Sequence, residues 1–527
     1  MNESRRPKPA VLLTLSGWGL SPNTPGNAIT KARTPNFDRF TREYPVMSLG
    51  ASGSDVGLLD FEAGNSRIGH LNLGAGRIYQ KILPRINQAI KDGSFYGRHS
   101  LNAAIQNALD NNSTLHIITM FGNQIQNAND EHFFALLEMA KAGGIKKVLV
   151  HAILDGEDDI YNNAKNHIQK IEERMKEFGV GKIVSLSGRY YALDNGRHWD
   201  RTQIVYDAMV NGKTKYVFSD ATSALQDSYN RQVYDRDFIP AVIGVEAGST
   251  IINKNDSVIF ANFGASLCRQ LTKAFVLPAF PKFERSYLRN LCFVTMTDYE
   301  KEIPTLVAFP RSYIHNSLGE VLTKAGLSQI RIAETEKYAC VTTFFNGMYD
   351  EKFANAEWKM IPSKKLSQYD NEPEMSAHKI SSEIIKSIKS EKYDFILANF
   401  ANADAVSRTG NLSATVKACE ILDKEIGRIA DYVLAEDGVL FITSDHGNAE
   451  SVLNMQTGST DKTPSTNNVP FFIIKESLFG MSGRAGDPPD NDLSLLPKAG
   501  VLADVAPTIL KVLGIDKPEE MTGRTLI

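Results

Sequence analysis

Short runs of consecutive apolar residues recur along the chain, and between them lie longer stretches in which apolar residues repeat with helical spacing. A strand whose two faces are both covered in a parallel sheet is apolar throughout, so the short runs predict strands. These strands are expected at residues 10–15, 115–120, 147–154, 182–186, 257–263, 329–333, 393–400, 439–442 and 469–474. Helices are expected at residues 129–142, 161–178 and 412–434. This alternation of strands and helices predicts an α/β fold.

Length and composition narrow the class of protein. A chain of 527 residues is too long for one hydrophobic core and predicts two or more domains. The formal net charge of -3 gives no reason to expect a nucleic-acid or membrane-surface partner. The polar, basic first residues lead into a short apolar run, which is neither a signal peptide nor a membrane span. The four cysteines are widely separated, as is typical of reduced thiols, so we expect a soluble cytoplasmic protein.

Polar residues follow three of the predicted strands. Ser16 comes directly after residues 10–15, Asp404 follows residues 393–400, and Asp445 and His446 follow residues 439–442. In open α/β sheets, ligands bind beyond the carboxyl ends of strands, and an Asp-His pair suits a divalent metal. The pattern therefore indicates a cluster of the kind found in metal-dependent phosphatases. The alternative is that strand ends are simply polar, with Asp445 capping its strand.

A glycine-rich stretch at residues 64–76 contains Ser66 between Asn65 and a nearby histidine, His70. A serine in this setting is either an exposed nucleophile or a loop residue or helix N-cap. The residues alone leave both interpretations open.

Longer motifs connect these positions to a known family. They are Gly17-Trp-Gly-Leu20, Gly64-Asn-Ser66, Gly69-His-Leu-Asn-Leu-Gly-Ala-Gly76, Ser187-Gly-Arg-Tyr-Tyr191, Trp199-Asp-Arg201, Arg331-Ile-Ala-Glu-Thr-Glu-Lys-Tyr-Ala339, Phe345-Asn-Gly347, Pro373-Glu-Met-Ser376 and Asp445-His-Gly-Asn-Ala-Glu450. Over nearly its whole length the chain resembles the cofactor-independent phosphoglycerate mutases of the alkaline phosphatase superfamily. The resemblance implies two three-layer α/β domains in a monomer. A discontinuous phosphatase-like domain would span residues 1–80 plus 311–527, and an inserted phosphotransferase-like domain would span residues 81–310.

In that family two manganese ions activate a serine, which moves a phosphoryl group between the hydroxyls of phosphoglycerate in glycolysis. The resemblance places the nucleophile at Ser66. Of the family's metal-ligand positions, four retain a suitable residue: Ser66, Asp404, Asp445 and His446. Three are replaced: Ser16, Arg408 and Pro464. A guanidinium cannot ligate a cation, so we expect no metal or one manganese ion, with Asp461 the nearest carboxylate that can substitute.

Most of the substrate-binding positions implied by the resemblance also carry a different residue from the family's. Asp158, Arg189 and Lys337 are retained, whereas Asn127, Glu157, Asn195, Gly264 and Leu267 are replacements. Four of the family's five arginines are absent. If each charged hydrogen bond contributes about 1.5 kcal/mol, the four absent arginines reduce the binding free energy of the substrate by about 6 kcal/mol, which is roughly 10⁴-fold in affinity. Arg67, beside the predicted nucleophile, adds a cation near the metal position.

Two functional hypotheses follow. The first is an inactive or strongly impaired pseudoenzyme with a binding or regulatory role, whose partner is a small phosphorylated metabolite or another protein. The alternative is an active metal-dependent phosphoryl-transfer enzyme that acts through Ser66, either as the glycolytic mutase or as a phosphohydrolase on another substrate.

Overall fold

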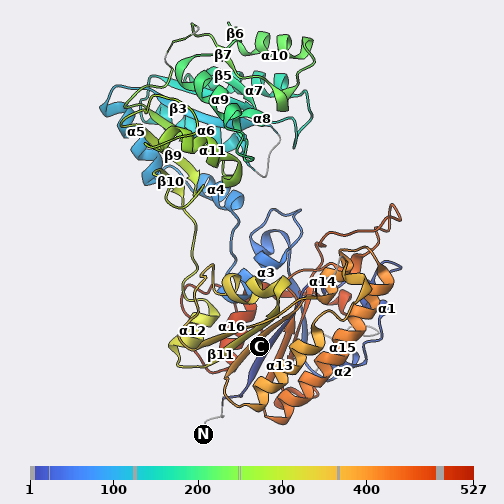
Figure 1. The fold of residues 1–527 in the computed structure, drawn as a ribbon. Helices are drawn as coiled ribbons and strands as arrows, with labels where there is room; N and C mark the ends of the chain where they lie inside the picture. The colour runs from blue at the N-terminus through green and yellow to red at the C-terminus, as the bar shows by residue number, and fades with distance from the viewer. Residues whose placement is uncertain are drawn as a thin grey trace. The chain divides into compact units, whose positions relative to one another are not determined.

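A computed structural model describes residues 6–22, 24–122, 127–246, 248–249, 251–364, 368–481 and 492–527. The chain divides into two compact units, unit 1 being Met1–Lys81 with Ser312–Ile527 and unit 2 being Ile82–Arg311. These boundaries lie one residue beyond those expected from the sequence. Each unit contains a mixed sheet with helices, which confirms the predicted α/β class (Figure 1). Among the described residues, no helix combines the length and apolar character that a membrane span requires.

Unit 1 is built on an eight-stranded sheet with the order β12-β11-β13-β1-β14-β15-β2-β16. In this order the strands are Ala356–Ile361, Gln329–Glu334, Phe395–Phe400, Ala10–Leu15, Val439–Thr443, Val469–Ile474, Val46–Gly50 and Lys498–Val501. The central strand β1 is parallel to both β13 and β14, whereas β15 is antiparallel to β14 and β2. Three strands that carry predicted site residues are therefore adjacent and point the same way.

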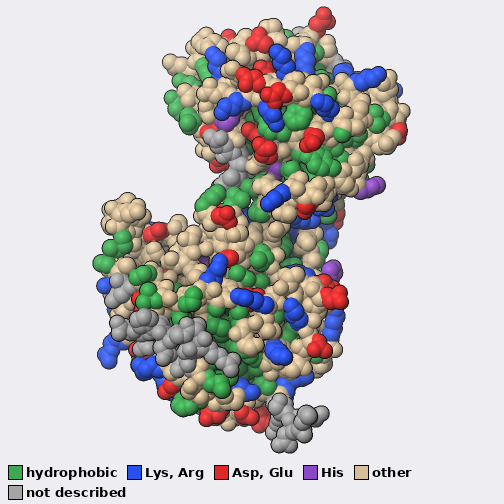
Figure 2. All heavy atoms as spheres, turned by 180° about the vertical axis from the view of Figure 1, so that it is seen from behind, with side chains coloured by type: hydrophobic (Ala, Val, Ile, Leu, Met, Phe, Trp, Pro, Cys, Tyr) green, Lys and Arg blue, Asp and Glu red, His purple; other side chains and the backbone are tan. Residues whose placement is uncertain are grey.

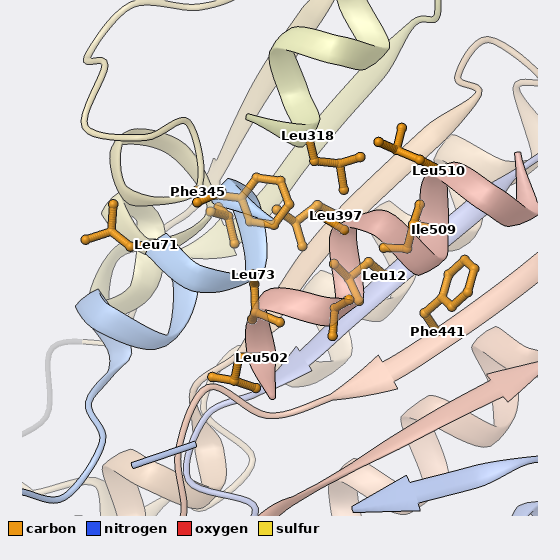
Figure 3. Close-up of a cluster of buried hydrophobic side chains, with 14 of the residues drawn as sticks. Leu12, Leu71, Leu73, Leu318, Phe345, Leu397, Phe441, Leu502, Ile509 and Leu510 are labelled. Atoms are coloured by element: carbon orange, nitrogen blue, oxygen red, sulfur yellow. The ribbon is translucent and has the colours of Figure 1, made fainter. Parts of the chain in front are cut away.

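Helices cover both faces of this sheet. They are α1 (Ala28–Lys31), α2 (Pro35–Glu43), α3 (Ser66–Ala75), α12 (Leu318–Lys324), α13 (Ala377–Lys389), α14 (Asn402–Ser407), α15 (Leu412–Ala435) and α16 (Val505–Val512). Successive residues of β1 point to opposite faces, so Leu12 joins one core with α3, α12 and α16, and Leu13 joins the other with α2, α13 and α15. Figure 3 shows the first of these cores.

Unit 2 contains a second eight-stranded sheet with the order β10-β9-β8-β3-β4-β5-β7-β6. In this order the strands are Leu306–Phe309, Cys292–Thr297, Ser257–Phe260, Leu115–Phe121, Val148–Leu154, Lys182–Gly188, Ala241–Ile243 and Val217–Phe218. Its helices are α4 (Ile82–Lys91), α5 (His99–Asp110), α6 (Asp130–Ala142), α7 (Ala164–Phe178), α8 (Arg189–Ala192), α9 (Trp199–Asn211), α10 (Ala221–Asn230) and α11 (Ala265–Val276). All pairs are parallel except β5 with β7.

Each strand predicted from an apolar run is present, but some boundaries differ. The strand expected at residues 257–263 ends at Phe260, and the helix expected from residue 161 begins at Ala164. The structure also settles the local conformation of the glycine-rich stretch, because Ser66 is the first residue of α3. The helix cap is Asn65, whose side chain accepts a hydrogen bond from the Ile68 backbone N–H.

Candidate functional site

Five predicted residues meet near the carboxyl ends of β1, β13 and β14. Ser16 Oγ donates a hydrogen bond to Asp445 Oδ2 at 2.9 Å, and Ser66 Oγ lies 3.1 Å from His446 Nε2. His446 Nε2 is 3.7 Å from Asp445 Oδ1 and 3.9 Å from Asp404 Oδ1. Ser66 is half-buried, and the other four side chains are buried. The expectation that these strand ends form one cluster agrees with this geometry.

Two side-chain cations surround Asp404. Lys337 Nζ donates hydrogen bonds to Asp404 Oδ2 and to Ser66 Oγ, both at 2.6 Å. Arg408 Nε donates to Asp404 Oδ1 at 2.9 Å, and Asn448 Nδ2 donates to the same oxygen at 2.9 Å. Both carboxylate oxygens of Asp404 are therefore occupied by protein donors.

The charges in this cluster favour the ionised state of each partner. Burial on its own would raise the pKa of Asp404, but the charges of Lys337, His446 and Arg408 outweigh it and hold the pKa well below its usual range. Burial would likewise lower the pKa of Lys337, but the carboxylates of Asp404 and Asp445 raise it above the ordinary value. The buried ammonium is therefore charged at neutral pH and pairs with Asp404.

A second polar layer lies behind Ser16. Asn399 Nδ2 donates to Ser16 Oγ at 2.9 Å, and His70 Nδ1 lies 3.3 Å from Asp445 Oδ2. Sequence reasoning singled out His70 only as a neighbour of Ser66 and gave no role to Asn399 or Asn448. Asn399 is a single polar residue inside the apolar run of β13, and Asn448 follows Asp445 and His446 within one motif, so neither position suggested a role by itself.

Three other residues that the sequence associates with the metal site, Asp461, Pro464 and Arg67, make local contacts in the structure. The Asp461 carboxylate accepts hydrogen bonds from the backbone N–H and hydroxyl of Thr463, so it is engaged within its own loop. Pro464 is half-buried in that loop. Arg67 is exposed and lies over the ring of Phe344, with 5.6 Å between guanidinium carbon and ring centroid.

In unit 2, the predicted substrate residues form an ion-pair cluster. Arg189 Nη1 donates to Asp155 Oδ1 at 2.5 Å and to Asp158 Oδ2 at 2.9 Å, and its Nε lies 3.5 Å from Glu157 Oε2. One guanidinium thus faces three carboxylates. Arg236, which sequence reasoning did not identify, adds a second cation at 3.2 Å from Glu157 Oε2.

The remaining predicted positions in unit 2 divide into two groups. Asn127 Nδ2 lies 3.5 Å from Asp158 Oδ2, and the Gly264 backbone N–H donates to the Asn127 carbonyl oxygen at 3.2 Å, so both adjoin the cluster. Asn195 is exposed, and Leu267 is half-buried against the hydrophobic core of unit 2. Leu267 is therefore a packing residue.

Comparison with known proteins identifies the family. A model described as the Metalloenzyme superfamily matches residues 8–517. A 2,3-bisphosphoglycerate-independent phosphoglycerate mutase from Clostridium botulinum is 42% identical over 522 residues, with 99% of both chains covered. The chain belongs to this mutase family. The protein of the same name from Clostridium acetobutylicum is 44% identical, with 98% of this chain and 99% of that one covered.

A solved structure supports the same assignment. The phosphoglycerate mutase of Leishmania mexicana, crystallised at low cobalt concentration, has 25% sequence identity and a TM-score of 0.58. The comparison covers 99% of this chain and 98% of that structure. The resemblance to this mutase family inferred from the motifs is confirmed.

The model that matches the chain describes a superfamily of metalloenzymes, whose members need side chains that can hold metal ions. Within the described parts of the chain, no group of three or more His, Cys, Asp and Glu side chains is placed to hold one. Each oxygen of Asp404 accepts a hydrogen bond from a side-chain cation, an ammonium at one and a guanidinium at the other, and neither cation has a lone pair to offer a metal. Asp445 Oδ1 is buried without a hydrogen-bond partner among the described residues, and it lies 3.7 Å from His446 Nε2, which in turn lies beside Ser66. The residues present do not fit a two-metal cluster.

Proposed function

We propose that this chain is a mutase-family protein in which side-chain cations take the place of metal ions at Asp404, so that mutase turnover is absent or strongly impaired. Its role is then binding or regulation. The observation that carries this proposal is the pairing of each Asp404 oxygen with a side-chain cation, Lys337 at one and Arg408 at the other. A cation bound at Asp404 would have to displace both, and Arg408 would repel it.

The cluster in unit 2 supports the same conclusion. Phosphoglycerate is an anion at both its carboxylate and its phosphate, and recognition of such groups relies on uncompensated, bidentate arginines. Arg189 is already paired with Asp155 and Asp158 and lies beside Glu157. An anion would compete with three carboxylates for this one guanidinium.

The second candidate function is active, metal-dependent phosphoryl transfer through Ser66, on phosphoglycerate or another phosphoester. The comparisons favour it over the first, because the relatives called mutases match the chain over nearly its whole length. The unpartnered Asp445 Oδ1 also leaves a place where Ser66, Asp445 and His446 would hold one divalent ion, manganese being the candidate. A bound ion would polarise a phosphoryl oxygen, while Lys337 holds Ser66 Oγ in position for attack.

A coupled assay distinguishes the two functions. Interconversion of 3-phosphoglycerate and 2-phosphoglycerate is measured at high protein concentration with manganese, with Ser66→Ala as the matched control. Turnover that the substitution abolishes would establish the enzyme and refute the first proposal. Rates equal to the control support impaired turnover, and the same pair of proteins is then tested on a general phosphoester such as p-nitrophenyl phosphate.

The proposal includes the location, the oligomeric state and the binding partners of the protein. We place it in the cytoplasm as a monomer that binds a small phosphorylated metabolite or another protein, and we expect no nucleic-acid or membrane partner. The support is the near-neutral charge balance and the scattered cysteines, each of which is free. Light scattering coupled to size exclusion tests the monomer.

A further inference from the structure

A charged residue lies in the hydrophobic core of unit 1. Along β11, Ile330 and Ile332 face one core and Ala333 faces the other, which is the core shown in Figure 3. Arg331 points to the same side as Ala333 and is fully buried. Its guanidinium carbon lies 4.9 Å from the ring centroid of Phe345 and 5.3 Å from that of Phe395.

The protein leaves most of this guanidinium without a partner. Arg331 Nη2 donates to Gln329 Oε1 at 2.5 Å, but Nε and Nη1 have no hydrogen-bond partner among the described residues. Nor does any carboxylate in that part of the chain form an ion pair with it. Burial lowers the pKa of Arg331 to about 9, which still leaves it charged at neutral pH. Contacts with the two aromatic rings offset part of the cost of burying this charge, but they satisfy none of the N–H groups in the guanidinium plane.

Asn346 and Ser317 also have unpartnered polar atoms, and Asn346 lies close to Arg331. Both polar side-chain atoms of Asn346, Nδ2 and Oδ1, are buried without a hydrogen-bond partner among the described residues, and so is the hydroxyl of Ser317. Arg331 Nη2 and Asn346 Oδ1 lie 2.6 and 3.1 Å from the position that a Cβ on Gly319 would take, so both lie against Gly319. Ser317 is two residues before Gly319 in the chain. Buried polar groups are almost always hydrogen-bonded, so this concentration indicates a partner that is not protein.

We propose that a small monovalent anion of the chloride class binds beside Arg331 and Asn346. Most of the unpartnered groups there are donors: two guanidinium nitrogens and an amide nitrogen. A buried cation without a carboxylate needs negative charge, which water does not supply. The cluster is sealed from solvent, which excludes a phosphate ester or a carboxylate ligand with a chain attached. This site is separate from Asp404 and does not depend on which candidate function is correct.

The direct test uses bromide as a heavy substitute for chloride. Crystals of the full chain grown in sodium bromide are measured at the bromine absorption edge. An anomalous peak within hydrogen-bonding distance of Arg331 Nε or Nη1 is the expected result. Density at this position without an anomalous signal would identify water and overturn the proposal. Closely packed side chains with no additional density would overturn it as well.

A second measurement tests the anion in solution. The melting temperature is compared in sodium chloride and sodium gluconate at equal ionic strength, and we expect the higher value in chloride. Arg331→Met should abolish the difference. The matched control is Arg98→Met, because Arg98 also lies over a phenylalanine ring, Phe309 at 4.3 Å, but is half-exposed. An equal chloride effect in Arg331→Met would refute the site; if that variant does not fold, the bromide map of the unaltered chain decides.

Discussion

Replacement of Lys337 by methionine is the sharpest test of the ion cluster at Asp404. The substitution keeps most of the side-chain volume and removes only the ammonium, which donates to Asp404 and Ser66. Asp404 then retains Arg408 and Asn448 as partners at one oxygen and loses the partner at the other. We expect a large loss of stability in unit 1.

The magnitude follows from burial. The Lys337 and Asp404 side chains are 10% and 3% exposed, and removal of one partner from such a pair costs about 3–5 kcal/mol. The Arg408 side chain is 47% exposed, so solvent screening reduces its contribution to about 0–1 kcal/mol. Lys337→Met should therefore lower the free energy of unfolding several times more than Arg408→Met does.

Urea unfolding followed by tryptophan fluorescence measures both variants. The three tryptophans are Trp18, Trp199 and Trp358, and only Trp199 lies in unit 2. In a Trp199→Phe background the signal comes from unit 1 alone. Losses of 1 kcal/mol or less for both substitutions would show that the buried ammonium is not the main partner of Asp404 and would refute the electrostatic argument.

Three further results are expected. Gly17 and Gly326 both have a positive φ, +82° and +75°, but a Cβ on Gly17 would lie 2.8 Å from the Asp404 backbone, whereas a Cβ on Gly326 would meet nothing within 4 Å. Gly17→Ala should therefore lower the urea midpoint much more than Gly326→Ala does. Equal shifts would contradict this packing. Burial lowers the pKa of His132 from 6.5 to about 4, so as the pH falls the unfolded state binds a proton at His132 before the folded state does. The free energy of unfolding should therefore decrease by about 3 kcal/mol as the pH falls from 6.5 to 4. His132→Gln should remove this acid-dependent loss in urea titrations, and an unchanged pH profile would refute it. Finally, EDTA should leave the melting temperature unchanged, whereas a drop of several degrees would reveal a bound structural metal.

The fold could be predicted from the sequence wherever a strand is buried on both faces. β1, β13 and β14 are apolar throughout because helices cover both sides, and the runs that mark them are unambiguous. The edge strand Ala356–Ile361 escaped prediction because it is mostly exposed and carries polar residues. The strand Cys292–Thr297 was missed as well, although it is largely buried; its threonines interrupt the apolar run.

The candidate site was predictable in part for a geometric reason. Adjacent parallel strands end at one edge, so Ser16, Asp404 and Asp445 had to lie close together once their strands were recognised. The position of Lys337 was not predictable in this way. The resemblance placed it with the substrate residues, whereas the structure places its ammonium on Asp404. A long side chain from a turn reaches a site that no strand register specifies.

The two predicted binding regions share one electrostatic property, because the cations in each are already paired with carboxylates. In unit 1 Lys337 and Arg408 both pair with the single carboxylate of Asp404, and in unit 2 Arg189 pairs with Asp155 and Asp158. A phosphate ester therefore meets cations that are already paired, so its binding must first break ion pairs within the chain. A single metal ion beside Asp445 would add positive charge in unit 1 and leave the pairing in unit 2 unchanged. We therefore expect metal binding and substrate binding to respond to different substitutions: removal of the carboxylates beside Arg189 should change the affinity for phosphoglycerate without changing the affinity for manganese.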